Sequence, residues 1–205
     1  MQVLVTGGAG YVGSHTVAAL QEAGHTPVVL DTLEHGNEAA AGDATLVIGD
    51  VADRELVPRV LREYEIECVM HFAAYIEVGE SMEAPMKYYR NNTAASLALL
   101  ESMLEAGVHR FVFSSTAAVY GQPDDVPIPE DAPKRPINVY GHSKLQTEEA
   151  CAWLSRQTEL SYAALRYFNA CGAHASGRIG EARAKETHLI PLVLQVPLGQ
   201  REAIK

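Results

Sequence analysis

Four glycines within residues 3–15, VLVTGGAGYVGSH, interrupt a sequence that otherwise predicts a strand running directly into a helix. Gly8, Gly10 and Gly13 fit the spacing G-x-G-x-x-G, and Gly7, Gly10 and Gly13 fit G-x-x-G-x-x-G. Glycine at such positions permits a tight turn, lets backbone amides approach a pyrophosphate, and lets the helix pack on the strand. A diphosphate would then lie at the N-terminus of a helix beginning near Tyr11. The stretch therefore predicts a dinucleotide-binding turn.

Two acidic residues follow later apolar runs. Asp31 ends the second run, 18 residues beyond Gly13, where a carboxylate can accept hydrogen bonds from both hydroxyls of an adenine ribose. Because it would repel a 2′-phosphate, it favours NAD over NADP as the cofactor. Asp50, which ends the third run, could meet the adenine amino group. The alternatives are a solvent-facing acid for Asp31 and a helix cap or surface acid for Asp50.

Short apolar runs alternate with helical patterns along the chain. Runs with apolar residues on both faces suit parallel strands buried between two helix layers. The strands are expected at residues 2–6, 27–31, 44–50, 66–72, 110–115 and 160–168. The helices are expected at residues 11–23, 53–64, 85–106 and 140–157, with Asp53 as N-cap of the second. The alternation predicts an α/β fold with a doubly wound parallel sheet.

Composition and charge exclude several classes of protein. The net charge of −10 would repel phosphate backbones, so we expect no nucleic-acid partner. No run of about 18 apolar residues predicts a membrane span, and no basic region precedes the first strand as in a secretory signal. Cys68, Cys151 and Cys171 are odd in number and far apart, which favours reduced thiols in the cytoplasm. Cys68 is expected to be a small buried apolar residue.

Two segments depart from the alternation of strands and helices. Residues 121–138, GQPDDVPIPEDAPKRPIN, contain five prolines and predict a long ordered loop at the upper edge of the sheet. Residues 188–205, HLIPLVLQVPLGQREAIK, predict a helix and the beginning of a further element, and then the sequence stops without a terminal pattern. We therefore expect the chain to be the front part of a longer protein.

A pair of residues with acid–base chemistry begins the last long helical pattern. In YGHSK, Tyr140 and Lys144 are four residues apart and so share one helix face. A nearby ammonium would favour the phenolate and lower the pKa of Tyr140 from its usual value of about 10. Ser114, Ser115 and Thr116 lie at the carboxyl end of the fifth strand, where open α/β sheets bind ligands. The alternative for these hydroxyls is turn formation.

These motifs together carry a resemblance to a known family. The glycine loop, Asp31, HFAAYIEVGES (71–81), YYRNN (88–92), FSSTAAVYG (113–121), YGHSK and LRYFNACGAHASGRIGE (165–181) resemble the extended short-chain dehydrogenase/reductases. Among these, the sequence is most similar to the UDP-glucose 4-epimerases, also called UDP-galactose 4-epimerases. The resemblance implies a Rossmann-type NAD-binding domain over residues 1–168. It also implies that residues 169–205 begin a smaller substrate-binding domain that is mostly absent from this chain.

The resemblance also assigns roles to matching positions. Catalysis is implied for Tyr140, Lys144 and Thr116. Cofactor contacts are implied for Gly7, Gly10, Tyr11, Val12, Gly13, Asp31, Asp50, Val51, Phe72, Ala73, Ala74, Asn91, Ser114, Tyr140, Lys144 and Phe168. Substrate contacts are implied for Thr116, Tyr140, Asn169, His188 and Leu189. A lysine that contacts NAD in some relatives is Ile76 here, so that contact is absent.

The implied activity is the interconversion of UDP-glucose and UDP-galactose in galactose metabolism. Tyr140 would take the proton of the C4 hydroxyl, helped by Thr116 and Ser115, while hydride passes to tightly bound NAD and a 4-keto sugar forms. The family also implies a homodimer. Another NAD-dependent sugar-nucleotide epimerase or dehydratase, and a non-catalytic NAD-binding module, are the alternatives. Whether N-acetylhexosamine sugars are also substrates stays open.

The histidines outside these motifs carry little functional signal. His15, His25, His35, His109 and His142 are scattered without the spacing of metal ligands, so we expect no metal ion. His71 ends an apolar run and is expected to lie in the core or to support the site from behind.

Overall fold

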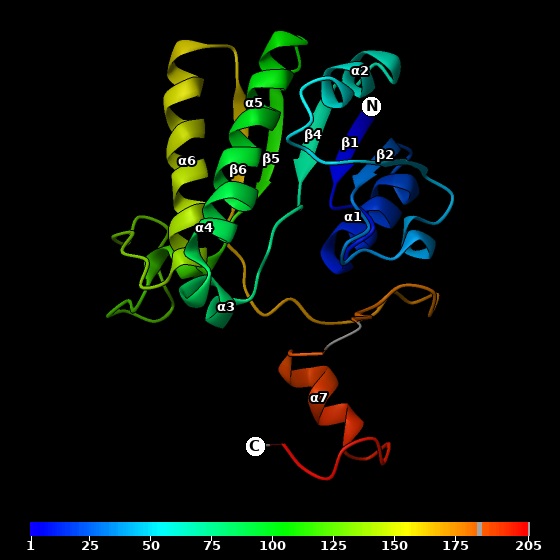
Figure 1. Ribbon diagram of the computed structural model, residues 1–205, viewed down its shortest axis with the longest axis vertical. Coiled ribbons are helices and arrows are strands. Elements are labelled where there is room, and N and C mark those ends of the chain that lie inside the picture. The colour runs from blue at the N-terminus through cyan, green and yellow to red at the C-terminus, as the bar shows by residue number, and fades with distance from the viewer. Residues whose placement is uncertain (184–185, 205) are drawn as a thin grey trace.

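The computed structural model describes residues 1–183 and 186–204, which form a six-stranded parallel sheet with helices on both faces (Figure 1). The strands are β1 (Gln2–Thr6), β2 (Thr26–Asp31), β3 (Thr45–Ile48), β4 (Cys68–His71), β5 (Arg110–Ser114) and β6 (Ser161–Leu165). Their order is β3-β2-β1-β4-β5-β6, so the winding reverses between β1 and β4. This confirms the doubly wound, Rossmann-type fold, whose ligands bind where the order reverses.

The helices follow the expected order with two differences. They are α1 (Tyr11–Glu22), α2 (Leu56–Glu63), α3 (Val78–Glu83), α4 (Pro85–Tyr88), α5 (Ala95–Glu105), α6 (Val139–Gln157) and α7 (Leu189–Gln195). The helical stretch expected at 85–106 is present, but it is not α-helical throughout, because a π-helical segment at Tyr89–Ala94 lies between α4 and α5. Such a segment inserts an extra residue into the helical turn and is frequent at functional sites. The short helix α3 was not expected.

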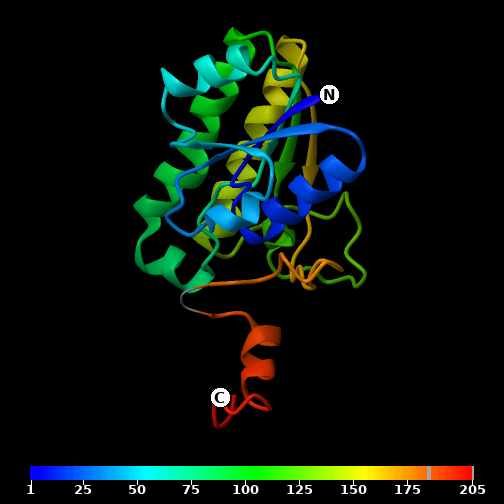
Figure 2. The same cartoon turned by 90° about the vertical axis from the view of Figure 1, so that its right-hand side faces the viewer.

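Alternate residues of each strand pack on opposite faces of the sheet. Leu4 and Leu30 join a cluster with Val57 of α2 and Leu99 of α5. Val3 and Val5 point the other way and pack against Val17 of α1. Figures 1 and 2 show α5 and α6 side by side over the first face. Burial on both faces explains why the inner strands β1, β2 and β4 are largely apolar, whereas no residue of the edge strands β3 and β6 is fully buried.

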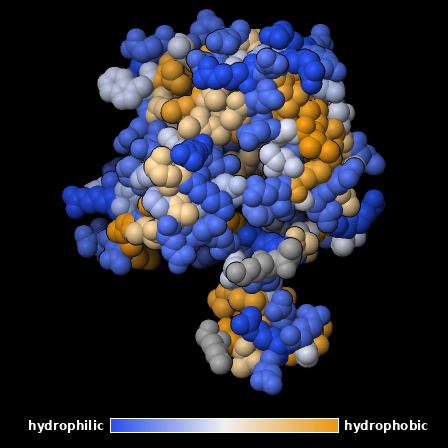
Figure 3. Space-filling model, in the orientation of Figure 1, coloured by the Kyte–Doolittle hydropathy of each residue, from blue (hydrophilic) through white to orange (hydrophobic). Residues whose placement is uncertain are grey.

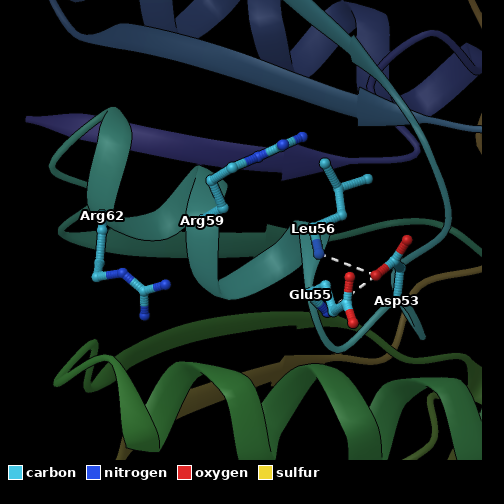
Figure 4. A pocket seen from close by; sticks show the side chains of 5 residues that line it. All are labelled: Asp53, Glu55, Leu56, Arg59 and Arg62. Atoms are coloured by element: carbon cyan, nitrogen blue, oxygen red, sulfur yellow. Dashed lines mark hydrogen bonds between the residues drawn. The ribbon is translucent and has the colours of Figure 1, made fainter.

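Asp53 supports the start of α2 from outside the helix. Its Oδ1 accepts hydrogen bonds from the backbone amides of Glu55 and Leu56, both at 2.9 Å (Figure 4). The capping role predicted for Asp53 is therefore confirmed, since its carbonyl also accepts from the amide of Val57, although the regular helix begins only at Leu56. The expected chemistry is present, because a carboxylate oxygen satisfies free amides of the first turn.

The proline-rich loop 121–138 is folded back onto the sheet edge. The hydroxyl of Tyr120 donates to the carbonyl of Glu130 at 3.0 Å, and Ile128 packs against Val119 and Leu145. At its end, the side chain of Asn138 accepts a hydrogen bond from the amide of Gly141 at 2.7 Å and caps α6. The loop thus fixes where α6 begins.

Beyond β6 the chain leaves the sheet. In both ribbon views α7 lies apart from the sheet, and Figure 3 shows orange, apolar side chains on its surface. Leu189 is 67% exposed and Leu194 is 55% exposed. Among the described residues, no helix has both the length and the apolar character needed to cross a membrane.

Candidate active site

The glycine loop between β1 and α1 has no room for side chains at Gly7, Gly8 and Gly13, and the closest approaches are at Gly7 and Gly13. Gly7 has φ of +70°, and a Cβ there would lie 2.5 Å from the backbone nitrogen of Ala73. A Cβ on Gly13 would lie 2.1 Å from the carbonyl oxygen of Gly7. The first close approach brings the loop against the end of β4, and the second lets α1 begin directly under it. Both are demands of a dinucleotide-binding turn.

The N-terminus of α1 opens toward a cavity. Gly10 occupies the cap position without a side chain, and the first turn, YVGS, carries no acidic residue. A cavity of about 240 Å³ lies beside this turn and is lined by Tyr11, Val12, His15 and residues 170–173. The free amides and the dipole of a helix of 12 residues make this end suited to an anion.

Asp31 joins the end of β2 to the glycine loop. Its Oδ2 accepts from the amide of Ala9 at 3.0 Å and its Oδ1 accepts from the amide of Leu33 at 2.9 Å. The side chain is buried, so the alternative of a solvent-facing acid is wrong. Asp50 lies two residues beyond the end of β3, is exposed, and accepts from the amide of Ala52 at 2.8 Å. Val51 beside it is buried.

The segment after β4 lies against the glycine loop on the other side. Phe72 donates its amide to the carbonyl of Thr6 at 2.9 Å, and Ala73 touches Gly7 as described. Ala74 is the next residue of this segment and is half-buried, as are Phe72 and Ala73. The glycine turn, Asp31 and residues 72–74 therefore meet at the reversal point of the sheet, as the sequence predicted.

Thr116, Tyr140 and Lys144 meet at the end of β5. Thr116 is buried, and its hydroxyl lies close enough to the phenol of Tyr140, which is half-buried on the first turn of α6, to lower the pKa of that phenol. The Oγ1 of Thr116 also accepts from the amide of Ala118 at 3.1 Å. One turn along α6, Lys144 is 2% exposed and donates its Nζ to the carbonyl of Ser114 at 2.8 Å. The expected shared helix face is thus directed at the strand end.

The predicted lowering of the Tyr140 pKa by Lys144 is wrong for this structure. Burial raises the pKa of Tyr140 above its usual value, and the hydrogen bond with Thr116 opposes that rise only in part. Burial also lowers the pKa of Lys144 to about 7. The Lys144 amine is thus directed to a backbone carbonyl, and only part of the molecules carry a proton on it at neutral pH. The positive charge that was expected to lower the pKa of Tyr140 is therefore incomplete.

The sequence missed a buried asparagine that holds the site together. Asn91, which was predicted to contact the cofactor, donates to Asn92 Oδ1 at 3.0 Å. Asn92 is buried, accepts from the amide of Tyr75 and donates to its carbonyl, both at 2.9 Å, and donates to Ser143 Oγ at 3.2 Å. Both lie in the π-helical segment, which hydrophobic periodicity does not reveal. Asn92 therefore ties α6 to the loop after β4.

His71 and Cys68 have the environments that the sequence predicted. His71 is buried at the end of β4, where its two ring nitrogens form hydrogen bonds with Thr6 Oγ1 at 2.6 Å and Ser96 Oγ at 2.8 Å. Burial, with the nearby Lys144, lowers the pKa of His71 to about 3. It is therefore a neutral core residue behind Lys144. Cys68 is buried in β4, and burial raises the pKa of its thiol.

Four of the expected site residues form no hydrogen bond with Tyr140 among the described residues: Phe168, which the resemblance places by the cofactor, and Asn169, His188 and Leu189, which it places by the substrate. Phe168 is 62% exposed, and Asn169 after it has φ of +52°. His188 and Leu189 lie at the start of α7, away from the sheet (Figure 1). His188 instead bonds Glu181, and its ring lies with Glu181 and Glu186 in a cluster whose ligand-type atoms are within 4.8 Å of one another.

A second cavity, of about 510 Å³, is unrelated to the predicted site. It lies at α2 and is lined by Asp53, Glu55, Leu56, Arg59 and Arg62 (Figure 4). Two acids and two arginines nearly cancel in charge, and none of these residues was predicted to bind cofactor or substrate. The reversal point of the sheet, and not this cavity, is the candidate active site.

Comparison with known proteins matches the whole chain. The model of the NAD dependent epimerase/dehydratase family matches residues 3–204. A UDP-glucose 4-epimerase of Halalkalibacterium halodurans is 50% identical over 204 residues, which are 100% of this chain and 61% of that protein. The chain thus spans about three fifths of the length of the curated relatives it matches.

Solved structures give the same match. The crystal structure of UDP-glucose 4-epimerase from Brucella ovis in complex with NAD superposes with a TM-score of 0.97 at 41% identity, covering 99% of this chain and 62% of that one. The enzyme from Bifidobacterium longum in complex with NAD+ and UDP gives a TM-score of 0.92 at 36% identity, covering 98% and 64%.

Proposed function

The chain belongs to the NAD dependent epimerase/dehydratase family, and from this premise we propose that the complete protein is an NAD-dependent UDP-glucose 4-epimerase. It interconverts UDP-glucose and UDP-galactose through a 4-keto sugar. The observation that supports the proposal most directly is the placement of the Thr116 hydroxyl beside the phenol of Tyr140 at the end of β5, with Lys144 one turn further along α6 and bonded to the carbonyl of Ser114. A hydroxyl, a phenol and an amine at the reversal point of a dinucleotide fold are the groups that a sugar alcohol oxidation needs.

NAD fits the residues at this point. Side chains are excluded at Gly7 and Gly13, so backbone can approach a diphosphate closely, and the N-terminus of α1 offers free amides. Asp31 lies where a carboxylate meets the ribose hydroxyls of NAD. The residues proposed to hold NAD are Gly7, Gly10, Tyr11, Val12, Gly13, Asp31, Asp50, Val51, Phe72, Ala73, Ala74, Asn91, Ser114, Tyr140, Lys144 and Phe168. The chemistry that the dinucleotide supplies when bound is reversible acceptance of hydride from carbon C4 of the sugar.

Tyr140 is the proposed acid and base. Its phenolate takes the proton of the C4 hydroxyl as the sugar is oxidised and returns it after the 4-keto sugar has turned over. Because burial raises the pKa of Tyr140, the phenolate must be stabilised by neighbouring groups if it is to form near neutral pH. Thr116 supplies part of this stabilisation by hydrogen bonding, and the positive nicotinamide together with protonated Lys144 would supply the rest. Lys144 also holds the ribose next to the nicotinamide.

The substrate is proposed to extend toward the segment after β6. Asn169, His188 and Leu189 would contact the UDP part, with residues 1–168 forming the NAD-binding domain and residues 169–205 beginning the substrate-binding region. Exposed apolar residues on α7, including Leu189 and Leu194, support this division, because no residue of α7 is buried against the described part of the chain. The relatives are longer than this chain, which is consistent with further chain closing the substrate pocket.

Partners and location follow from the same proposal. A homodimer is proposed, and exposed Leu97 on α5 and Trp153 on α6 offer apolar surface for it. The buried thiols of Cys68 and Cys151 suit a reducing compartment, so we place the protein in the cytoplasm. The net charge of −10 disfavours nucleic acid as a partner.

Two other functions use the same fold. A sugar-nucleotide dehydratase would need additional acid–base carboxylates next to Thr116, but Ala117 and Ala118 follow it in this chain. A non-catalytic NAD-binding module would not need Tyr140 and Lys144 directed at Thr116. Neither has a specific observation in its favour.

The test is to incubate the complete protein with UDP-galactose and to analyse the products. Formation of UDP-glucose without added NAD supports the epimerase with retained cofactor. A 4-keto-6-deoxy sugar product would overturn the epimerase proposal in favour of the dehydratase. Retained NAD with no change in the sugar would replace it by the binding module.

A further inference from the structure

The three consecutive hydroxyls at the end of β5 have three different partners. Ser114 Oγ forms a hydrogen bond with the hydroxyl of Tyr167 at 2.6 Å, and Thr116 Oγ1, which lies beside the phenol of Tyr140, accepts from the amide of Ala118 at 3.1 Å. Ser115, between them, donates its Oγ to Glu148 Oε1 at 2.5 Å. Ser115 is therefore directed away from the phenol, and the expectation that it helps Thr116 to relay the proton does not fit its position.

Glu148 is a buried carboxylate held by cations. It is 3% exposed and lies one turn beyond Lys144 on α6. Arg166 donates to it from Nε at 2.9 Å and from Nη2 at 2.8 Å, and Lys134 Nζ donates at 3.1 Å. Burial alone would raise the pKa of Glu148, but the hydrogen bonds from Arg166, Ser115 and Lys134 outweigh it and lower that pKa. The carboxylate thus stays ionised.

This cluster joins the segments that carry the site. Glu148 belongs to α6, and Arg166 follows β6 directly. Arg166 also donates from Nη1 to the hydroxyl of Tyr120 at 2.6 Å and to the carbonyl of Glu130 at 3.0 Å, so it holds the proline-rich loop as well. Three chain segments far apart in sequence therefore converge on one carboxylate, and Ser115, next to Thr116, is the residue of the strand end that bonds this carboxylate directly.

We propose that Glu148 is a positioning residue, which fixes Ser115 and through it holds Thr116 in contact with Tyr140. The inference rests on the proposed function, since it assigns the geometry of the same reaction. Ser115 takes no part in proton transfer; its hydroxyl is a fixed link between the strand and α6. Arg166 and Lys134 act on the reaction only by keeping the carboxylate in place.

A purely structural ion cluster would behave differently. Buried ion pairs often add little to stability, and removal of one partner is felt mainly as destabilisation. If Glu148 acts on catalysis through Ser115, its substitution changes kcat when Ser115 is present and changes it little when Ser115 is absent. Coupling of this kind is what a double-mutant cycle measures.

The experiment uses the complete protein with UDP-galactose and compares Ser115→Ala, Glu148→Gln and the double variant. We expect each single variant to lower kcat by about tenfold, because a small displacement of Thr116 from Tyr140 misaligns the reacting groups. KM should stay within about twofold, since the bound sugar loses no contact. The double variant should be no slower than the slower single variant. Glu149→Gln, the same change at the exposed neighbouring position, is the matched control and should keep wild-type kcat.

Wild-type kcat in Ser115→Ala, or losses in kcat that simply add in the double variant, would overturn the inference. Should Glu148→Gln fail to fold, Lys134→Met replaces it in the cycle. This variant removes one of the cations that hold the Glu148 carboxylate, and Lys134 is only partly buried. A crystal structure of Ser115→Ala needs no turnover and so separates the two proposals. Loss of the contact between Thr116 and Tyr140 in it supports the positioning role even if wild-type protein proves inactive, which would overturn only the proposed function. An unchanged contact would overturn the positioning role.

Discussion

Lys144, buried on α6, donates its Nζ to the backbone carbonyl of Ser114 at 2.8 Å and so joins the helix that carries Tyr140 to the last residue of β5. Its nitrogen also lies 5.0 Å from the centre of the Phe113 ring, and neutral His71 is nearby. In such surroundings the lysine nitrogen has lost its hydrating water, and one carbonyl and one aromatic face replace that water as its contacts. Its charge is therefore costly until a bound dinucleotide changes the site.

Stability should depend on pH through Lys144. Burial lowers its pKa to about 7 in the folded protein, against a usual value of about 10.4 in an unfolded chain. Between these values the unfolded state holds a proton that the folded state lacks, so this group makes the free energy of unfolding rise with pH from about 7 to about 10. Lys144→Met should remove that slope and raise the free energy of unfolding at pH 6 by about 2 kcal/mol while abolishing turnover. Urea unfolding of cofactor-free protein at pH 6 and 9 measures both; an unchanged slope would contradict the argument.

Tyr140→Phe should abolish epimerisation but not cofactor binding. It removes only the phenol hydroxyl, and loss of a general acid–base typically lowers kcat by about 10²- to 10⁴-fold. Turnover of UDP-galactose and the NAD content of denatured protein measure the two effects. Tyr162→Phe, which removes a phenol hydroxyl from β6, is the matched control and should stay active. An active Tyr140→Phe variant would remove Tyr140 from the mechanism.

At Thr116 the hydroxyl should matter and the methyl group should not. Thr116→Ser keeps the oxygen that bonds Tyr140 and accepts from the amide of Ala118, so we expect kcat within about threefold of wild type. Thr116→Val keeps the shape but loses both hydrogen bonds. Its kcat should fall by about 100-fold, and its free energy of unfolding by about 1 kcal/mol. Steady-state kinetics and thermal unfolding of the pair test this; equal kcat values for both variants would refute it.

Much of the fold, and the place of several candidate site residues within it, was predictable because each depends on local pattern. Short runs with apolar residues at successive positions indicated buried strands. The spacing of the glycines located the turn that Gly7 and Gly13 form. Asp31 and the pair Tyr140 and Lys144 followed from position at strand ends and from helical spacing. These features need only a few neighbouring residues, so the sequence displays them directly.

What the sequence did not reveal depends on contacts between distant segments. Asn92 is buried because a π-helical segment turns it toward Tyr75 and Ser143, and no periodic pattern marks that segment. Glu148 shares a helix face with Lys144, yet its partners Ser115 and Arg166 directly follow two different strands, β5 and β6. The pKa of Tyr140 was predicted in the wrong direction for the same reason. Desolvation is a property of the packed structure, and spacing says nothing about it.

Gly13→Ala should disrupt the cofactor site. The added Cβ would lie 2.1 Å from the carbonyl oxygen of Gly7, which is backbone and cannot move aside without opening the turn. We expect loss of retained NAD and a decrease of about 2–3 kcal/mol in the free energy of unfolding. Gly79→Ala in α3 adds the same atom where nothing lies within 4 Å, so it should leave stability unchanged or slightly raised. NAD content and chemical unfolding of both variants measure the difference. Equal behaviour of the two would show that the turn tolerates a side chain.

Asp31→Asn should shift the choice of dinucleotide. The carboxylate accepts from the amides of Ala9 and Leu33, and an asparagine, having one acceptor oxygen, can keep only one of these bonds. The lost bond should lower the free energy of unfolding by about 1 kcal/mol. Removing the negative charge also removes repulsion of a 2′-phosphate, so the ratio of NADP to NAD affinity should rise by about tenfold. Calorimetric titration of nucleotide-free protein with each dinucleotide gives the ratio.

Asp50→Asn is the control for this experiment. It lies at an exposed position expected near the adenine and not the 2′-phosphate, and it should leave the ratio unchanged. A ratio that stays at the wild-type value in Asp31→Asn would mean that Asp31 serves the glycine loop alone and does not select the cofactor.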